Sequence, residues 1–196
     1  MFANRFTALM DACALVSALK RNLLLSLAGA DFFRVRWSVR ILDEAERNIA
    51  KLIAARGLLD AEDRAARARG AMERAFGDAV VTGYEGLIGG LMGLPDPDDA
   101  HVIAAAVKTR ASVIVTDNLR HFPRSVLLPL DLEAKTTDVF AADAIDLDAG
   151  RAVAAIRRMR MRFGKPEKTA EVLLLDMEAA GLTQTVDVLR EHTRSL

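Results

Sequence analysis

The stretch Leu94–Pro123, LPDPDDAHVIAAAVKTRASVIVTDNLRHFP, decides the fold. Its two opening prolines favour a turn, because the residue before a proline is held away from helical angles. Asp98 and Asp99 follow, and acidic side chains suit the start of a helix. Ala100–Lys108 then predicts a helix, and the β-branched run Ser112–Thr116 predicts a strand buried on both faces. The stretch therefore indicates turn, helix and buried strand.

Asp117 and Asn118 stand directly after that strand. In open α/β sheets, ligands bind outside the carboxyl ends of the strands. Both residues also tolerate the left-handed angles of an ordinary turn, and Asp98 and Asp99 suit plain helix capping. Taken alone, this stretch leaves both interpretations open.

Asp11 repeats the same placement near the start of the chain. Thr7–Met10 predicts a strand, and Ala12–Ala28 carries apolar residues at helical spacing. Asp11 lies between them, either as a helix cap or as a ligand at the edge of the sheet. Cys13 has no histidine near it in sequence, which favours a packed core thiol over a nucleophile.

A second strand, Phe32–Trp37, precedes a predicted helix, Val39–Ala55. Glu44 and Glu46 flank the apolar face of this helix on opposite sides, and Asp43 points away. Spacing alone does not choose among the three acids, each of which could be a solvated surface residue.

The remaining segments complete an α/β pattern. A charged helix is expected at Asp60–Phe76, a short strand or turn at Ala79–Thr82, and an edge strand at Glu133–Thr137. From about Asp143 the pattern is helical only, with helices expected at Asp148–Phe163, Glu167–Ala180 and Thr183–Thr193. We predict a domain at residues 1–142 and a helical appendage at 143–196, which is too small for an independent core and packs on the main domain or on a partner.

Composition narrows the class of protein. The 196 residues are 52% hydrophobic and 28% charged, with zero formal net charge, which is globular and gives no overall attraction to nucleic acid. One cysteine excludes an intrachain disulfide and favours a reducing compartment. Because no signal segment or membrane-length apolar stretch is evident, we expect a cytoplasmic protein without a membrane association.

Three segments together resemble the PIN-domain nucleases, specifically the bacterial VapC-type toxin ribonucleases. They are LMDACAL at Leu9–Leu15, WSVRILDEAERN at Trp37–Asn48, and LPDPDDAHVIAAAV with VIVTDNLRHFP within Leu94–Pro123. The resemblance covers roughly residues 5–140, and the C-terminal helices resemble the extra helical domain of one VapC subgroup. It implies a FLAP-nuclease-like fold, with a central parallel sheet, helices on both faces, and acids at the carboxyl edge that bind Mg²⁺ or Mn²⁺.

Carried over by position, the family's first acid falls on Asp11 and its helix glutamate on Glu44. The third falls on the pair Asp98–Asp99, with Asp99 favoured because it leads directly into the helix. Many relatives place a fourth aspartate where this chain has Asn118, and here Asp117 comes one residue earlier. The resemblance thus implies catalytic residues Asp11, Glu44, Asp99 and Asp117, with Asp98 and Asn118 as further metal ligands. Whether one or two metals bind stays open.

Phosphodiester hydrolysis needs an activated water and a positive charge beside the phosphate, which divalent ions supply. Carboxylates without cysteine or histidine ligands favour Mg²⁺ or Mn²⁺ over zinc. The histidines at positions 101, 121 and 192 are scattered, so we expect surface or capping roles for them. His121 is of most interest because it lies close after Asp117.

Basic residues must flank an acidic cluster for RNA to approach it. Lys20, Arg21, Arg40 and Arg120 lie beside the acidic motifs, and the last three are the predicted RNA-binding residues. The run Arg157–Lys165 is a second basic candidate, or an ordinary solvated helix face.

These features predict a metal-dependent endoribonuclease that is the toxin of a type II toxin–antitoxin pair. Its expected partners are RNA and a cognate antitoxin protein, and a homodimer with a second copy of the chain is a further expectation. One alternative is a degenerate PIN domain that binds RNA or protein without cleaving, motivated by the irregular Asp117–Asn118 site. Another is a phosphate-accepting receiver-like domain, although receivers place their acidic pair directly after the first strand and Lys135 is only a partial match.

Overall fold

A parallel sheet forms the centre of the molecule. The computed structural model describes residues 6–164 and 168–196, and all strand pairs within this part are parallel. The five strands lie in the order β3-β2-β1-β4-β5. Their bounds are Thr7–Met10 (β1), Arg34–Ser38 (β2), Val80–Val81 (β3), Val113–Val115 (β4) and Glu133–Lys135 (β5). The predicted central parallel sheet is confirmed.

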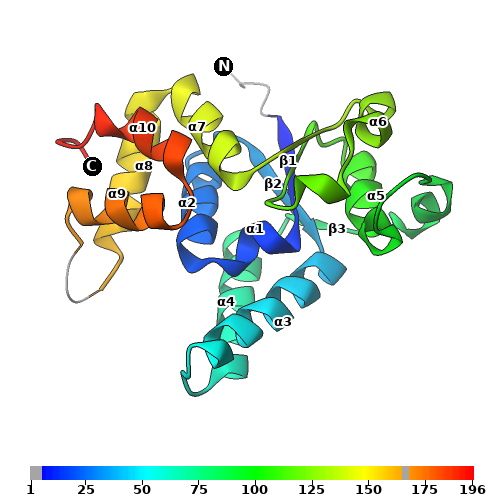
Figure 1. The fold of residues 1–196 in the computed structure, drawn as a ribbon, viewed down its shortest axis with the longest axis horizontal. Helices are drawn as coiled ribbons and strands as arrows, with labels where there is room; N and C mark the ends of the chain where they lie inside the picture. Colours follow the sequence, from blue (N-terminus) through cyan, green and yellow to red (C-terminus); the bar gives the residue numbers. More distant parts are fainter. Residues whose placement is uncertain (1–5, 165–167) are drawn as a thin grey trace.

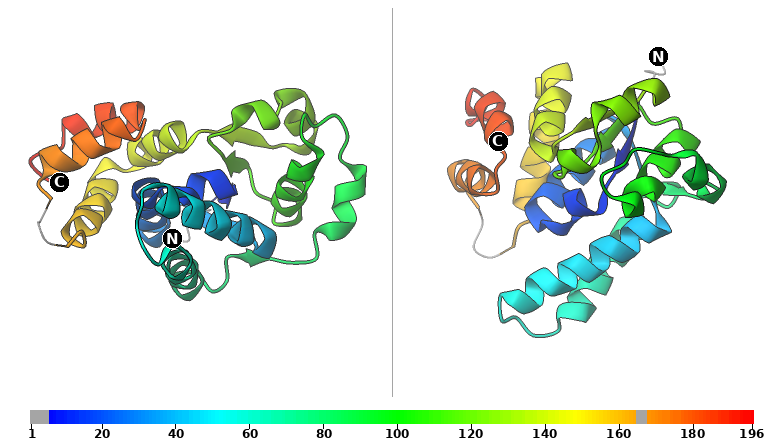
Figure 2. Two further views of the ribbon diagram at one scale, coloured as in Figure 1. Left: turned by 60° about the horizontal axis from the view of Figure 1, so that its bottom comes forward. Right: turned by 45° about the vertical axis from the view of Figure 1, so that its right-hand side comes forward.

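Helices cover both faces of this sheet. Figure 1 shows α2 on one side of β1 and β2 and α5 on the other. The helices are α1 (Ala12–Val16), α2 (Ala18–Gly29), α3 (Val39–Ala55), α4 (Ala61–Ala75), α5 (Ala100–Lys108), α6 (Arg124–Leu127), α7 (Thr137–Leu147), α8 (Ala149–Met161), α9 (Ala170–Ala179) and α10 (Thr183–Arg190). Figure 2 shows α3 and α4 side by side as a projecting pair.

The predicted helix over Ala12–Ala28 is wrong in one respect, because it is interrupted at Ser17. The backbone of Ser17 is extended, with ψ of 123°. This bend separates α1, which packs on α3, from α2, which packs on α8 and on β2. The apolar spacing could not reveal it, since both halves bury leucines on the same core.

The order of the strands creates the place where a site belongs. From β1 the chain moves outward through β2 to β3, and then crosses back to β4 and β5 on the other side of β1. The direction therefore reverses between β1 and β4, and ligands of such sheets bind in the crevice outside the carboxyl ends there. Asp11 follows β1 and Thr116 follows β4, so both lie at that crevice.

The C-terminal helices pack on the main domain, as predicted. The ring of Phe140 in α7 lies 4.8 Å from that of Phe33, and α8 packs along α2. Asp138 in α7 is buried, and its carboxylate accepts the backbone N–H groups of Gln184 and Thr185 at 3.0 and 2.8 Å. Asp138 thus caps α10, not its own helix, which Thr136 caps.

The boundary between residues 142 and 143 stays a prediction; α7 runs continuously through it. Within the described residues, none of the helices has both the length and the apolar character needed to cross a bilayer.

Candidate active site

Asp11 is held at the crevice by three donors. Its side chain is 7% exposed, and Oδ1 accepts the N–H of Ala12 at 2.6 Å. Oδ2 accepts the hydroxyl of Thr116, at the end of β4, at 2.8 Å, and the thiol of Cys13 at 3.0 Å. Asp11 therefore caps α1 and also joins the carboxyl ends of the two central strands.

Glu44 faces the same crevice from α3. The hydroxyl of Ser38 caps α3 by accepting the N–H of Ile41. The buried apolar face of α3 sets the rotation of the helix. Oε1 of Glu44 accepts a hydrogen bond from Arg40 at 3.2 Å and lies 3.3 Å from Nε2 of His101. His101 is 1% exposed, and burial, with the charge of Arg40, lowers its pKa to about 4, so its ring is neutral.

Asp43 and Glu46 face away from the crevice. Both bind Arg69 of α4, at 2.6 and 2.8 Å. The three acids of α3 are thus divided, with two holding the helix pair α3–α4 together and Glu44 left at the sheet edge. The structure therefore determines the orientation of α3 about its own axis, which residue spacing alone left open.

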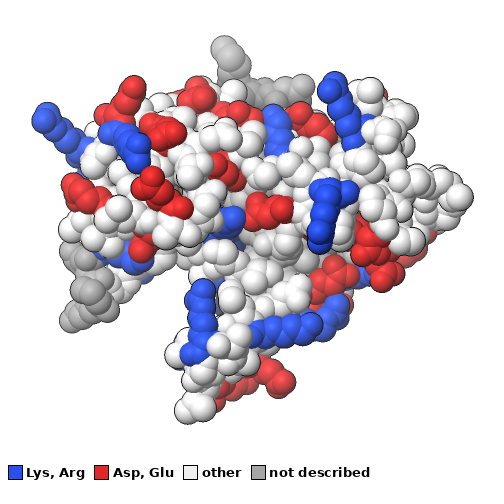
Figure 3. Space-filling view, in the orientation of Figure 1, with Lys and Arg blue, Asp and Glu red and all other residues white. Residues whose placement is uncertain are grey.

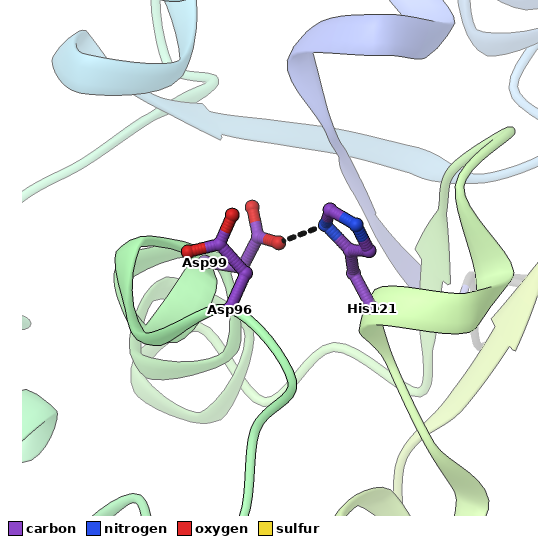
Figure 4. Close-up of side chains that lie close together, drawn as sticks. All are labelled: Asp96, Asp99 and His121. Atoms are coloured by element: carbon purple, nitrogen blue, oxygen red, sulfur yellow. Dashed lines mark hydrogen bonds and ion pairs between the residues drawn. The ribbon is translucent and has the colours of Figure 1, made fainter.

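Asp99 reaches the crevice from the start of α5. Asp99 occupies the N-cap position of α5, but its side chain makes no capping hydrogen bond. The side chain of Asp96 caps the preceding 3₁₀ turn, Pro97–Asp99. Oδ2 of Asp99 lies 2.6 Å from Nδ1 of His121. Figure 4 shows Asp96, Asp99 and His121 pointing toward one another from two segments. The side chain of Asp98 is 92% exposed and turns outward.

The charge of Asp11 acts on both Glu44 and Asp99. Burial raises the pKa of Glu44, and the charge of Asp11 raises it further, against the opposing contact with Arg40. Burial likewise raises the pKa of Asp99; the bond to His121 opposes this, and the charges of Asp11 and Asp96 add to it. A raised pKa means that the charged form of the carboxylate is disfavoured, and a cation bound beside it stabilises that charged form.

The fourth position differs from this group. The carboxylate of Asp117 accepts a bond from Lys20 at 2.7 Å and another from the N–H of Thr137 at 3.0 Å. Burial raises the pKa of Asp117, but these two bonds outweigh it and leave the pKa below its ordinary value. The side chain of Asn118 accepts a bond from Arg120 at 3.1 Å. In this conformation both side chains are engaged outside the acidic group.

Cys13 lies inside the site, where sequence reasoning did not place it. Burial, and then the charge of Asp11, raises its pKa to about 12, so the sulfur stays a thiol. The N–H of Asp117 donates to Sγ at 3.2 Å. Cys13 therefore positions Asp11 and the loop after β4.

The predicted RNA-binding residues have different surroundings. Arg40 is exposed and bridges Glu44 and the backbone oxygen of Asp98, at 3.2 and 3.3 Å. Arg120 lies beside Asn118, and Arg21 donates to the backbone oxygen of Leu15 at 2.6 Å. Figure 3 shows Lys and Arg side chains interspersed with acidic ones over this face.

Two site histidines were misjudged from the sequence. His101 is buried against Glu44, and His121 contacts Asp99, so the expectation of surface or capping roles is wrong for both. Asp96 was missed altogether. One atom each from Asp96, Asp99 and His121 lie within 4.8 Å of one another, a spacing that one cation can bridge. Two features of the sequence could have indicated these residues. They are the Pro–Asp–Pro turn before the acidic pair and the position of His121 beyond the strand.

This donor set fits a hard divalent ion. Asp11, Glu44 and Asp99 come from three elements, and the charge of Asp11 acts on both of the others. Mg²⁺ or Mn²⁺ prefers a few carboxylates with remaining positions filled by water. The sulfur of Cys13 stays a thiol, and the imidazoles of His121 and His101 lie against Asp99 and Glu44.

Comparison with known proteins agrees with this geometry. Residues 7–120 match the family described as PIN domain, and residues 137–191 match the VapC50 C-terminal domain. The chain is 40% identical over 96 residues to a Mycobacterium tuberculosis protein named "Putative ribonuclease VapC50". That similarity covers 49% of this chain and 56% of the relative's own length. No solved structure shows significant similarity to the chain.

The PIN domain match extends over more than half of the chain and contains Asp11, Glu44 and Asp99. The second match contains the helices that follow Thr136. These assignments remove the receiver-like alternative. The chain belongs to the PIN-domain family, in the VapC-type arrangement that carries a VapC50 C-terminal domain.

Proposed function

We propose that this protein is a metal-dependent endoribonuclease and the toxin of a type II toxin–antitoxin pair. The observation that carries the proposal is the placement of Asp11, Glu44 and Asp99 around the switch point of the sheet. Burial and the charge of Asp11 raise the pKa values of Glu44 and Asp99, and a cation bound there would stabilise their charged forms. The name of the mycobacterial relative supports a ribonuclease activity.

Asp11, Glu44 and Asp99 would hold Mg²⁺ or Mn²⁺. When bound, such an ion lowers the pKa of water and stabilises negative charge on a phosphate. Asp11 is the rigid member, since Ala12 and Thr116 fix both of its oxygens. Asp99 is oriented by the imidazole of His121. The side chains of Asp98, Asp117 and Asn118 are directed elsewhere, with Asp98 exposed, Asp117 bound to Lys20 and Asn118 bound to Arg120. We keep these last three as candidate ligands that would have to turn toward the ion.

Basic side chains at the rim would place the RNA. Arg40 lies between Glu44 and Asp98, and Arg120 and Arg21 are the other predicted contacts. Contacts of this kind position phosphates without reading bases. An active cytoplasmic ribonuclease needs an inhibitor, and an arginine of an antitoxin protein pairs well with a cluster of carboxylates. Self-association through the main domain is part of the same proposal.

Incubation of the purified full-length chain with single-stranded RNA tests the proposal. Cleavage should require Mg²⁺ or Mn²⁺, stop with EDTA, and fall by about a hundredfold or more in Asp11→Asn. The exposed Asp146→Asn is the matched control, because it lies on α7 away from the crevice. Activity of Asp11→Asn equal to that of the wild type would refute the site assignment.

One observation favours a second candidate, a PIN domain that binds RNA without cleaving it. The carboxylate of Asp117 is occupied by Lys20 and Thr137, so this acid does not face the other three. RNA binding that persists without any metal-dependent cleavage would favour this candidate. Co-purification with a small protein from the native host would test the toxin assignment in either case.

A further inference from the structure

A trench runs from the acidic site along the seam between the main domain and the C-terminal helices. Two adjoining cavities of about 700 and 600 Å³ form it, and they share Arg21 and Ala68. The floor is α2, one wall is α3 and α4, and the other wall is α8 and α9. Figure 3 shows the molecular surface hollowed between the α3–α4 pair and the C-terminal helices.

The trench begins at the candidate active site. Its first cavity is lined by Asp117 and Cys13, and Cys13 donates to the carboxylate of Asp11. A linear polymer cut at the acidic group must continue past it on at least one side. The trench is a continuous path for such a chain, and it extends away from the carboxyl ends of β1 and β4.

Unpaired positive charge lines both walls. Arg56 and Arg64 stand on the α3–α4 wall of the first cavity, and Arg158 stands on the α8 wall of the second. Among residues 6–164 and 168–196, none of these three guanidinium groups has a hydrogen bond or ion pair. The acids of the first cavity are already neutralised, because Lys20 binds Asp117 and Lys168 binds Asp176.

Apolar surface alternates with these charges. The second cavity is lined by Phe76, Phe163 and Met72 beside Arg158 and Arg162. Grooves that bind single-stranded nucleic acid combine cations along the backbone with aromatic or apolar surface for the bases. An acidic peptide could also bind these arginines. Nothing in such a peptide would favour a path that starts at the acidic residues of the candidate active site.

We propose that this trench binds single-stranded RNA on one side of the cleavage site, with the C-terminal helices as its second wall. Arg56, Arg64 and Arg158 are the phosphate-binding residues. The proposal rests on RNA being the substrate of the proposed function, and it assigns the helical appendage a role in holding that substrate.

The test compares two triple variants with equal loss of charge. Arg56→Gln, Arg64→Gln and Arg158→Gln together remove the trench cations. The control is Arg67→Gln, Arg74→Gln and Arg157→Gln on α4 and α8, the helices that carry Arg64 and Arg158. None of the three control arginines lines the trench. All of these arginines are exposed, so the variants should fold, and equal melting temperatures would verify this.

Binding of a fluorescent single-stranded RNA of about 15 nucleotides is measured in EDTA, so that cleavage does not interfere. The trench variant should bind at least about tenfold more weakly than the control. The slope of log K against log salt should become shallower by about 0.7 for each phosphate that the variant no longer neutralises. Equal affinity and slope in the two variants would overturn the trench assignment, even if the wild type cleaves RNA.

Two further outcomes separate this proposal from the proposed function. If the wild type does not cleave but the trench variant loses binding, the ribonuclease assignment fails and the trench stands. If the wild type binds polyglutamate through the same arginines and does not bind RNA, the trench is a protein-docking site and the proposal is overturned.

Discussion

Nδ1 of His121 lies 2.6 Å from Oδ2 of Asp99, and the two residues come from segments on either side of β4. This contact fixes the carboxylate that the start of α5 presents to the crevice. A side chain that orients a metal-binding carboxylate affects metal affinity nearly as much as the carboxylate itself. His121 contacts Asp99 in this way, whereas the side chains of Asp117 and Asn118 bind Lys20 and Arg120.

We expect His121→Ala to raise the Mn²⁺ concentration needed for half-maximal RNA cleavage by about tenfold to a hundredfold. His121→Asn, which can still donate a hydrogen bond to Asp99, should recover part of the loss. A metal titration of cleavage rate measures both. An unchanged titration in His121→Ala would mean that the contact is incidental.

Glu44 and Glu46 provide a matched pair on one helix. Glu44→Ala should lower kcat/KM by about a hundredfold, because it removes a carboxylate from the acidic group. Glu46→Ala should leave cleavage within a few fold and reduce stability by about 0.5 kcal/mol, because it loses only a partly exposed ion pair with Arg69. The reverse order of activities would show that Glu46 serves the site.

Much of this arrangement could be predicted from local sequence. A strand followed at once by Asp11, and a proline turn followed by Asp99, each place an acid at the carboxyl edge of a parallel sheet. Such positions depend on where an element begins or ends, which neighbouring residues determine. The capped helix Val39–Ala55 was predictable for the same reason, and its observed bounds agree.

What could not be predicted depends on packing between distant segments. The family resemblance favoured Glu44, but residue spacing did not choose between Glu44 and Glu46. The structural reason is Arg69, which binds Asp43 and Glu46 on the side of α4. The direction of Asp117 follows from Lys20 on α2 and the backbone of Thr137. Neither contact has a signature in sequence spacing, because each joins residues that are far apart along the chain.

Asp138 links the C-terminal helix α10 to α7. We expect Asp138→Ala to cost about 2–3 kcal/mol of unfolding free energy, since two backbone N–H groups of α10 lose their acceptor. For a chain of this size, that lowers Tm by roughly 4–12 °C. Asp146→Ala on the same helix, where the side chain is exposed, is the control. Calorimetry of both variants makes the comparison, and equal Tm values would contradict a structural role for Asp138.

Asp11→Asn and Asp99→Asn should both abolish metal-dependent cleavage and yet differ in stability. The carboxylate of Asp11 accepts from Ala12, Thr116 and Cys13, so an amide group there turns a donor toward donors. That substitution should cost about 1–3 kcal/mol without metal. Within residues 6–164 and 168–196, the carboxylate of Asp99 makes one hydrogen bond, to His121, and its charge is repelled by Asp11 and Asp96. Asp99→Asn should therefore leave the metal-free Tm unchanged or slightly higher.

Thermal unfolding in EDTA, followed by the same measurement in Mn²⁺, distinguishes the two residues. Wild type should gain Tm with Mn²⁺, because a ligand that binds only the folded state stabilises it, and neither variant should gain as much. A fall in Tm for Asp99→Asn as large as that for Asp11→Asn would mean that Asp99 is a structural cap of α5. The absence of a capping bond from its side chain argues against that result, and is the reason that Asp99 is free to serve the site.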